Sequence, residues 1–190
     1  MTYMCADLHL THKQIHHYRG FDSTQAHDDF VEKRWLETIT KKAKSPCVEK
    51  QDTVFILGDV SFSREGWERL DSWPGFKTII LGNHCTEYAD AKYISSLKTV
   101  KAVHGLMKYK TAWLSHAPLH PDHLRGKRNI HGHLHGTIVK DRRYLNVSLE
   151  NTDMAPIHLD KVLAEFERRQ NLAYVYETLG REALFRALLP

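Results

Sequence analysis

Residues that could bind metal ions stand at the ends of several hydrophobic segments of this chain. They are aspartate, asparagine and histidine, and the segments are 2–9, 53–60, 77–84, 111–118 and the stretch NIHGHLHG at 129–136. The first four are rich in apolar, aromatic or β-branched residues, which predicts buried strands. Because ligands bind at the carboxyl ends of strands in open α/β sheets, we expect these side chains to meet at one edge of a sheet.

Two of the segments repeat a ligand-type residue after one intervening position. Asp7 and His9 are two residues apart, and so are His133 and His135. Residues i and i+2 of an extended strand point to the same side, so each pair could contact the same object. His131 is in phase with the second pair, but phase alone does not make it a ligand.

The candidate donors are oxygen and imidazole groups without a thiolate. Such a set suits Mn²⁺, Fe, Ni²⁺ or Zn²⁺. It contains Asp7, His9, Asp59, Asn83, His116, His133 and His135. These are more ligands than one tetrahedral ion needs, whereas two ions that share a bridging carboxylate would use them all. Such a pair can hold a hydroxide nucleophile and stabilise an in-line displacement at phosphorus.

Taken in order, the motifs resemble those of the calcineurin-like metallophosphoesterases. The matching blocks are Asp7-x-His9, Gly58-Asp59, Gly82-Asn83-His84, His116 and Gly132-His133-x-His135. A lone Asp-x-His or Gly-Asp is usually a turn, but five blocks in order are specific. The resemblance covers about residues 1–161, and ADLHLTHKQI and LNVSLENTDMAPIHLDKV further resemble small, uncapped bacterial and phage members.

The resemblance implies a fold and a division of labour among these residues. The fold would be an α/β, four-layer arrangement of two packed β-sheets flanked by α-helices, with the site on loops at the edge of the sandwich. One ion would be held by Asp7, His9, Asp59 and His135, and the other by Asp59, Asn83, His116 and His133. Asp59 and the attacking hydroxide would bridge the ions. His84 would face the substrate as the catalytic residue, and His131 would have a packing or supporting role.

The residue after His84 departs from the family pattern. Many members carry Asp or Glu there to orient the imidazole, and this chain carries Cys85. A thiol is a weak hydrogen-bond partner, so another carboxylate or a backbone carbonyl would have to orient His84.

Further residues are candidates for contact with the substrate or with the ligands. The resemblance suggests His12 as a substrate contact, with a surface or packing role as the alternative. Arg125 and Arg128 lie in a basic run that could bind a substrate phosphate or a nucleic-acid backbone, or could form a solvated loop. Hydrogen bonds around the site, or a plain turn, are expected of three more residues, Asn146, Ser148 and Glu150.

The rest of the sequence predicts one domain with an appendage. Helical patterns at 26–44, 63–73, 87–97 and 159–170 alternate with the predicted strands. We therefore expect a metallophosphoesterase domain over 1–170 and a C-terminal helical extension over 171–190 that packs on the same domain.

Composition restricts the class of protein further. The 190 residues are 42% hydrophobic, no apolar run could span a membrane, and MTYMCADLHL does not resemble a signal peptide, so we expect a cytoplasmic protein. Cys5, Cys47 and Cys85 are odd in number and widely spaced, which argues against a disulfide framework. A net charge of +4 would suit a phosphate-bearing partner without requiring one.

The leading hypothesis is a phosphoesterase with two divalent metal ions, Mn²⁺ by preference. Since the chain is too short for a large cap domain, an open site favours phosphodiesters, such as a cyclic nucleotide, a nucleotide derivative or a nucleic-acid end. The alternatives are a phosphomonoesterase, including a protein phosphatase, and a catalytically weak metal-binding scaffold for protein interaction. Both a monomer and a homodimer are compatible with the sequence.

Overall fold

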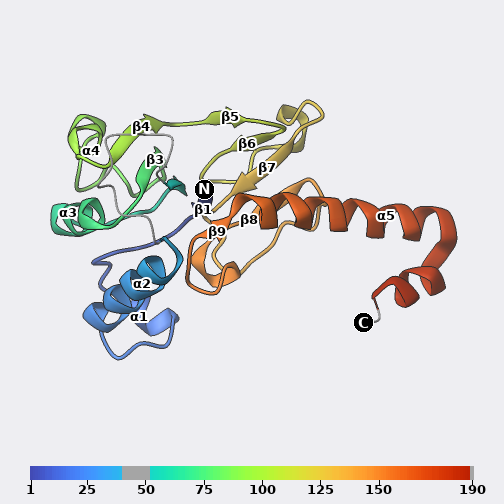
Figure 1. The fold of residues 1–190 in the computed structure, drawn as a ribbon, viewed down its shortest axis with the longest axis horizontal. Coiled ribbons are helices and arrows are strands. Elements are labelled where there is room, and N and C mark those ends of the chain that lie inside the picture. The colour runs from blue at the N-terminus through green and yellow to red at the C-terminus, as the bar shows by residue number, and fades with distance from the viewer. Residues whose placement is uncertain (40–51, 189–190) are drawn as a thin grey trace.

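Two β-sheets flanked by helices form the body of the protein (Figure 1). The computed structural model describes residues 1–39 and 52–188, with side chains up to residue 174. In the first sheet the strand order is β4-β3-β2-β1-β9, with β1 to β4 parallel and β9 antiparallel to β1. Its strands are β1 (Thr2–Cys5), β2 (Thr53–Leu57), β3 (Phe76–Ile80), β4 (Val100–His104) and β9 (Ile157–His158). The predicted α/β class is confirmed at this level.

The second sheet has the strand order β5-β6-β7-β8. Its strands are β5 (Met107–Tyr109), β6 (Ala112–Leu114), β7 (Arg128–His131) and β8 (Tyr144–Asn146). β5 pairs antiparallel with β6, whereas β6, β7 and β8 are parallel. A single parallel bridge joins Ala6, just after β1, to Ser148, just after β8. The carboxyl ends of parallel strands from both sheets therefore lie together.

Alternate residues of β1 face two different cores. Tyr3 and Cys5 pack with the helices on one side, in a core that includes Trp35 and Trp67. Met4 belongs to the core between the two sheets, which Phe166 of α5 also enters. Burial on both faces explains why the central strands are continuous apolar runs instead of alternating polar and apolar residues.

A serine or aspartate side chain caps the N-terminus of three of the helices. The helices are α1 (Ile15–Tyr18), α2 (Thr24–Thr38), α3 (Arg64–Ser72), α4 (Ala91–Ser96) and α5 (Leu159–Leu188), with 3₁₀ turns at Pro121–His123 and Leu149–Asn151. Ser23, Ser63 and Asp90 each accept a hydrogen bond from the backbone N–H three residues later, which satisfies a free donor of the first turn. The predicted helix 26–44 ends at Thr38, and residues 40–44 lie outside the described part of the chain.

The C-terminal part of the chain differs from the prediction. Instead of a helix over 159–170 and a separate extension over 171–190, α5 runs without a break from Leu159 to Leu188. Leu159, Val162 and Phe166 in its first turns are buried in the second core, while its later turns extend away from both sheets (Figure 1). No helix in the described ranges combines the length and the apolar character needed to cross a bilayer.

The strands that lead to the predicted ligands are shorter than the hydrophobic segments that predicted them. β1 ends at Cys5 instead of His9, and β3 ends at Ile80 instead of His84. Strands β4, β5, β7 and β9 were not predicted, because they are short or carry polar residues. The candidate ligands therefore lie on loops that follow the strands. Two cysteines, Cys5 and Cys85, are buried free thiols, and Cys47 lies outside the described residues.

Candidate metal centre

The loops after β1, β2, β6 and β7 bring six of the predicted ligands into two groups. Site A contains Asp7, His9 and His135, and site B contains Asp59, His116 and His133. Within each group, one potential ligand atom from every residue lies within 4.8 Å of the others. The family resemblance implies the same division of these ligands, but it assigns Asp59 to both groups and adds Asn83 to site B. The positions of these two residues are described next.

The carboxylate of Asp59 lies between the two groups. Its Oδ2 atom is 3.9 Å from His9 Nε2 of site A and 3.3 Å from His116 Nε2 of site B. Its Oδ1 atom accepts a hydrogen bond from the backbone N–H of His84 at 3.0 Å. Burial alone would raise the pKa of Asp59, but the hydrogen bond and charge of His116 outweigh it and lower the pKa to about 2. Asp59 is therefore an ionised carboxylate within reach of both groups.

Several acceptor atoms of site B converge on one nitrogen. His116 donates from Nδ1 to the carbonyl of Leu57 at 2.9 Å, so Nε2 is the ring atom that could bind an ion in place of the proton it shares with Asp59. Asn83 Oδ1 lies 2.9 Å from this Nε2, and His133 Nδ1 lies 3.1 Å from it. Asn83 is therefore a further candidate ligand of site B. Lone pairs that converge in this way are stabilised by a bound cation.

Site A contains buried polar atoms that lack a partner. Among the described residues, neither Asp7 Oδ1 nor either ring nitrogen of His9 forms a hydrogen bond. Burying such atoms unpaired is costly, so a cation that engaged them would remove the cost. Burial lowers the pKa of His9, which keeps the imidazole in the neutral form that binds metals. The residues present therefore fit a pair of metal ions.

Neighbouring side chains orient the site A ligands. Ser148 Oγ donates to Asp7 Oδ2 at 2.6 Å, which leaves Oδ1 free to bind an ion. Glu150 Oε1 accepts from His135 Nδ1 at 2.9 Å, so that the Nε2 atom of His135 remains for an ion. Asn146 Nδ2 donates to the carbonyl oxygen of His135 at 2.8 Å. The predicted hydrogen bonds of Asn146, Ser148 and Glu150 around the site are thus confirmed.

The backbone at the ligands is not extended, which corrects the reasoning from strand alternation. Positive φ angles occur at five of the candidate ligands: Asp7 (57°), His9 (53°), Asp59 (44°), His133 (69°) and His135 (49°). Asp7 and His9 still share a site, but His133 and His135 belong to different ones. Non-glycine residues in this region cost of order 1–3 kcal/mol each and cluster at functional sites.

Two glycines allow the close approach of these loops. A Cβ at Gly132 would lie 2.6 Å from Asp7 Oδ2 and 2.9 Å from the carbonyl oxygen of Leu57. Gly58 has a φ of 87°, and a Cβ there would overlap the ring of His116. A side chain at either position would displace a candidate ligand.

His84 belongs to neither group and faces an open hollow. Its Nδ1 atom is 2.7 Å from Glu87 Oε1, and its side chain is 39% exposed. Cys85 is buried, with its Sγ atom accepting from the N–H of Gly82. The carboxylate that orients His84 is therefore Glu87, three residues along the chain, and not the residue that follows it.

The hollow beside His84 has a volume of about 330 Å³ and also contains His12, Phe62 and Tyr88. His12 Nδ1 accepts from the backbone N–H groups of Gln14 and Ile15, which places its proton on Nε2. Burial lowers the pKa of His12, so it is a neutral donor that lines the hollow together with His84.

The structure does not bring Arg128, one of the two predicted arginines, to the site. Arg128 forms an ion pair with Glu167 of α5 at 2.7 Å, at the start of β7 and away from the histidines that follow this strand. His131 is buried and in neither group, and its Nδ1 contacts the carbonyl of Gly132 at 2.8 Å. Arg128 is therefore not placed beside the candidate ligands, whereas the contact expected of Arg125 with a substrate stays a prediction.

Two residues with roles at the site were missed in the sequence. Glu87 could have been found, because a carboxylate three residues after His84 can reach its ring in a turn. Arg19 contacts Glu150 across 131 positions and carries no local signal.

The chain is similar to two proteins of Mycobacterium phages and to one protein of solved structure. No protein-family model matches it. It is 31% identical to the Gene 66 protein of Mycobacterium phage L5, over 74% of this chain and 80% of that protein. It is 26% identical to the Gene 66 protein of Mycobacterium phage D29, over 76% and 85% of the two chains. The crystal structure of AQ665 from Aquifex aeolicus, a protein of unknown function, has the same fold, with a TM-score of 0.62 and 21% identity over 85% of this chain and 97% of that one. The chain belongs to the family of the Gene 66 protein of Mycobacterium phage L5.

Proposed function

We propose that this protein is a phosphoesterase that uses two divalent metal ions to hydrolyse phosphodiesters of the nucleotide type. The observation that carries the proposal is the position of Asp59, whose carboxylate lies within 3.9 Å of ligand atoms from both site A and site B. The order of the motifs, which resembles the calcineurin-like metallophosphoesterases, supports the same reading. So does an architecture of two sheets flanked by helices, which is compatible with the four-layer fold of that family.

The two ions would be held by the two groups of ligands and by Asp59 between them. One ion would bind Asp7, His9, His135 and Asp59, and the other would bind Asp59, Asn83, His116 and His133. Mn²⁺ is the preferred candidate for this set of oxygen and imidazole donors, with Fe, Ni²⁺ and Zn²⁺ as alternatives. When bound, the ions would supply Lewis-acid activation and stabilise the charge of the transferring phosphoryl group.

His84 would act as the general acid. Because Nδ1 is engaged by Glu87, Nε2 is the atom that can protonate the leaving oxygen. The Glu87 carboxylate would hold the His84 ring in place. His12 carries its proton on Nε2 and lines the same hollow, so it could donate a hydrogen bond to a phosphoryl oxygen.

Two hollows near site A favour a diester over a monoester. One is the hollow beside His84, and the other has a volume of about 420 Å³ and is lined by Ile15, Tyr18, His135, Gly136 and Glu150. The ring of His9 lies near one lining residue of each hollow, because its centroid is 5.1 Å from that of Phe62 and 4.9 Å from that of His135. A phosphodiester has two organic substituents, and each would find space in one hollow.

The test uses protein that has been stripped of metal and reloaded with Mn²⁺. We expect metal-dependent hydrolysis of bis-p-nitrophenyl phosphate at a higher rate than that of p-nitrophenyl phosphate. Faster cleavage of the monoester would replace the diesterase by a phosphomonoesterase. An absence of metal-dependent turnover of either compound would refute the enzyme and leave a metal-binding scaffold.

A further inference from the structure

Arg19 contacts backbone or side-chain groups that hold each of the three site A ligands in place. Arg19 lies just after α1, and its side chain is only 3% exposed. It donates from Nη2 to the carbonyl oxygen of Asp7 at 2.7 Å and from Nη1 to that of Leu8 at 3.3 Å. These carbonyls belong to the turn in which Asp7 and His9 have positive φ angles.

The same guanidinium reaches the third ligand through a carboxylate. Arg19 Nε and Nη2 are 2.9 and 2.8 Å from Glu150 Oε1, the atom that also accepts from His135 Nδ1. Glu150 therefore fixes both the orientation of the His135 ring and the position of its proton, while Arg19 fixes Glu150.

Arg19 is in turn anchored to helix α2. Its Nη1 atom donates to His27 Nε2 at 2.9 Å, and His27 Nδ1 donates to Asp28 Oδ1 at 2.8 Å. The other oxygen of Asp28 accepts from the backbone N–H of Thr11 at 2.9 Å. The loop that carries Asp7 and His9 is thus held by Arg19 at one end and by Asp28 at the other.

Site B is held in a different way. His116 donates to the carbonyl of Leu57, and Asp59 accepts from the N–H of His84, so its ligands are oriented by backbone groups near strand ends. None of the hydrogen bonds and ion pairs found for Arg19 among the described residues goes to a site B ligand.

We propose that Arg19 is a positioning residue that acts through Glu150 and the Asp7–His9 turn to set the affinity of site A alone. This inference rests on the proposed two-metal function. It predicts that the loss of Arg19 weakens the binding of one ion of the pair and leaves the other unchanged. A lysine would keep the charge but lacks the fork of donors needed to reach Asp7, Leu8 and Glu150 at once.

The experiment is calorimetric titration of the metal-free full chain with Mn²⁺, combined with EPR spectra of the loaded protein. The wild type should bind two ions and give the spectrum of a coupled pair. Arg19→Met should bind one ion with unchanged affinity and the second about 10- to 100-fold more weakly, with the coupled spectrum replaced by that of an isolated ion. Arg19→Lys should fall between the two.

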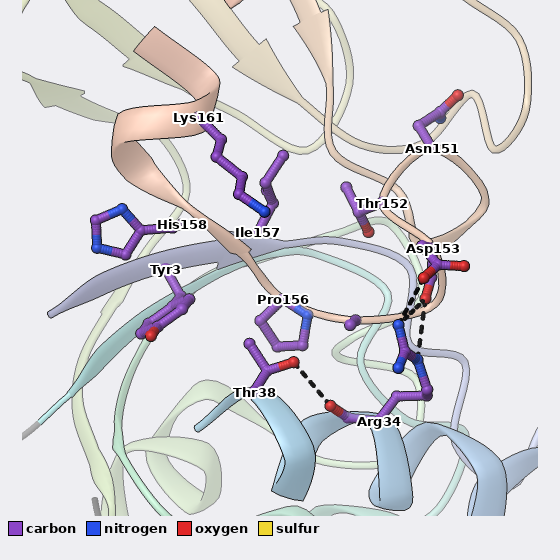
Figure 2. A pocket seen from close by; sticks show the side chains of 11 residues that line it. Tyr3, Arg34, Thr38, Asn151, Thr152, Asp153, Pro156, Ile157, His158 and Lys161 are labelled. Atoms are coloured by element: carbon purple, nitrogen blue, oxygen red, sulfur yellow. Dashed lines mark hydrogen bonds and ion pairs between the residues drawn. The ribbon is translucent and has the colours of Figure 1, made fainter. Parts of the chain in front are cut away.

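Arg34→Met is the matched control. Arg34 donates to the carbonyl and carboxylate of Asp153, in the loop that follows Glu150 (Figure 2). Among the described residues, none of its hydrogen bonds and ion pairs is with a candidate ligand. This variant should bind both ions as the wild type does. If instead Arg34→Met and Arg19→Met weakened binding alike, the effect would be one of general loop stability and the proposal would be wrong.

Other outcomes separate this inference from the proposed function. Unchanged binding of both ions by folded Arg19→Met, or an equal loss at both sites, would overturn the role of Arg19. If Arg19→Met does not fold, Glu150→Gln decides: it keeps an acceptor of the same shape, and unchanged affinity for both ions would overturn the proposal. A wild type that binds no Mn²⁺ would refute the two-metal function itself.

Discussion

Site A and site B have similar ligands but different supports. The ligands of site A are oriented mainly by the side chains of Ser148, Glu150 and Arg19, which come from distant parts of the sequence, while Asp7 Oδ2 also accepts from the backbone N–H of His133. The ligands of site B are oriented by backbone groups, including the carbonyl of Leu57 at the end of β2. Backbone groups at the ends of strands are held rigidly by the sheet. A loop side chain that orients a ligand can instead be removed by one substitution. We therefore expect the ion at site A to be the weaker and the more easily exchanged of the two.

Asp59→Asn should have the largest effect, because it changes the group that the two sites share. The amide keeps the shape of the side chain but removes the charge that can bridge two cations. We expect both ions to bind more weakly and Mn²⁺-dependent diesterase activity to fall below detection. Activity and metal content are the measurements, with Asp141→Asn, which alters a surface ion pair with Arg143, as the control. Full activity in Asp59→Asn would contradict a shared ligand.

His84→Ala should affect neither site but slow the chemistry. We expect two bound ions and a kcat lower by about 10²- to 10⁴-fold, the usual contribution of general acid–base catalysis. The control is His120→Ala, which removes an exposed histidine that also lies near a carboxylate, Asp122. Loss of an ion from His84→Ala, measured by metal analysis, would show that His84 is a ligand instead.

Ser148→Ala should separate the two sites by weakening only site A. The hydroxyl is buried and donates to Asp7 Oδ2, so its loss leaves that ligand without its main side-chain support. We expect about 10-fold weaker binding of one Mn²⁺ and no change in the other. Ser61→Ala is the control, since its hydroxyl is also buried but, within the described part of the chain, forms hydrogen bonds only with backbone groups of Leu10 and Ser63. Equal weakening of both ions would remove the distinction between the supports.

Glu87→Gln should have the smallest effect. The ion pair of Glu87 with His84 is partly exposed, and such pairs contribute about 0.2–1 kcal/mol, so we expect kcat to fall by no more than about 5-fold. Glu37→Gln is matched in exposure and in its spacing from its partner, Arg34, and should have no effect. A loss as large as that of His84→Ala would mean that Glu87 takes part in the proton transfer itself.

The sequence predicted the residues of the site better than the reason for their arrangement. Aspartate and histidine at strand ends could be recognised because each motif is local, and all seven candidate ligands come together. The argument from strand alternation was wrong, since Asp7, His9, His133 and His135 lie in turns with positive φ angles. Such angles depend on the packing of loops from both sheets, which no local pattern encodes.

The helices and strands were likewise predicted only where the local sequence carries a strong signal. Long apolar runs predicted β1, β2 and β3, because burial on both faces leaves a strong signal. The short strands β7 and β9 were missed, and the single helix α5 was divided in two. Contacts between remote residues, such as that of Arg19 with Glu150, could not be predicted from one sequence.

Anomalous diffraction from crystals grown with Mn²⁺ tests the central claim most directly. We expect two peaks, one among Asp7, His9 and His135 and the other among Asn83, His116 and His133, with Asp59 in contact with both. We also expect no peak at His131. A single peak, an absence of peaks or an ion bound to His131 would contradict that claim.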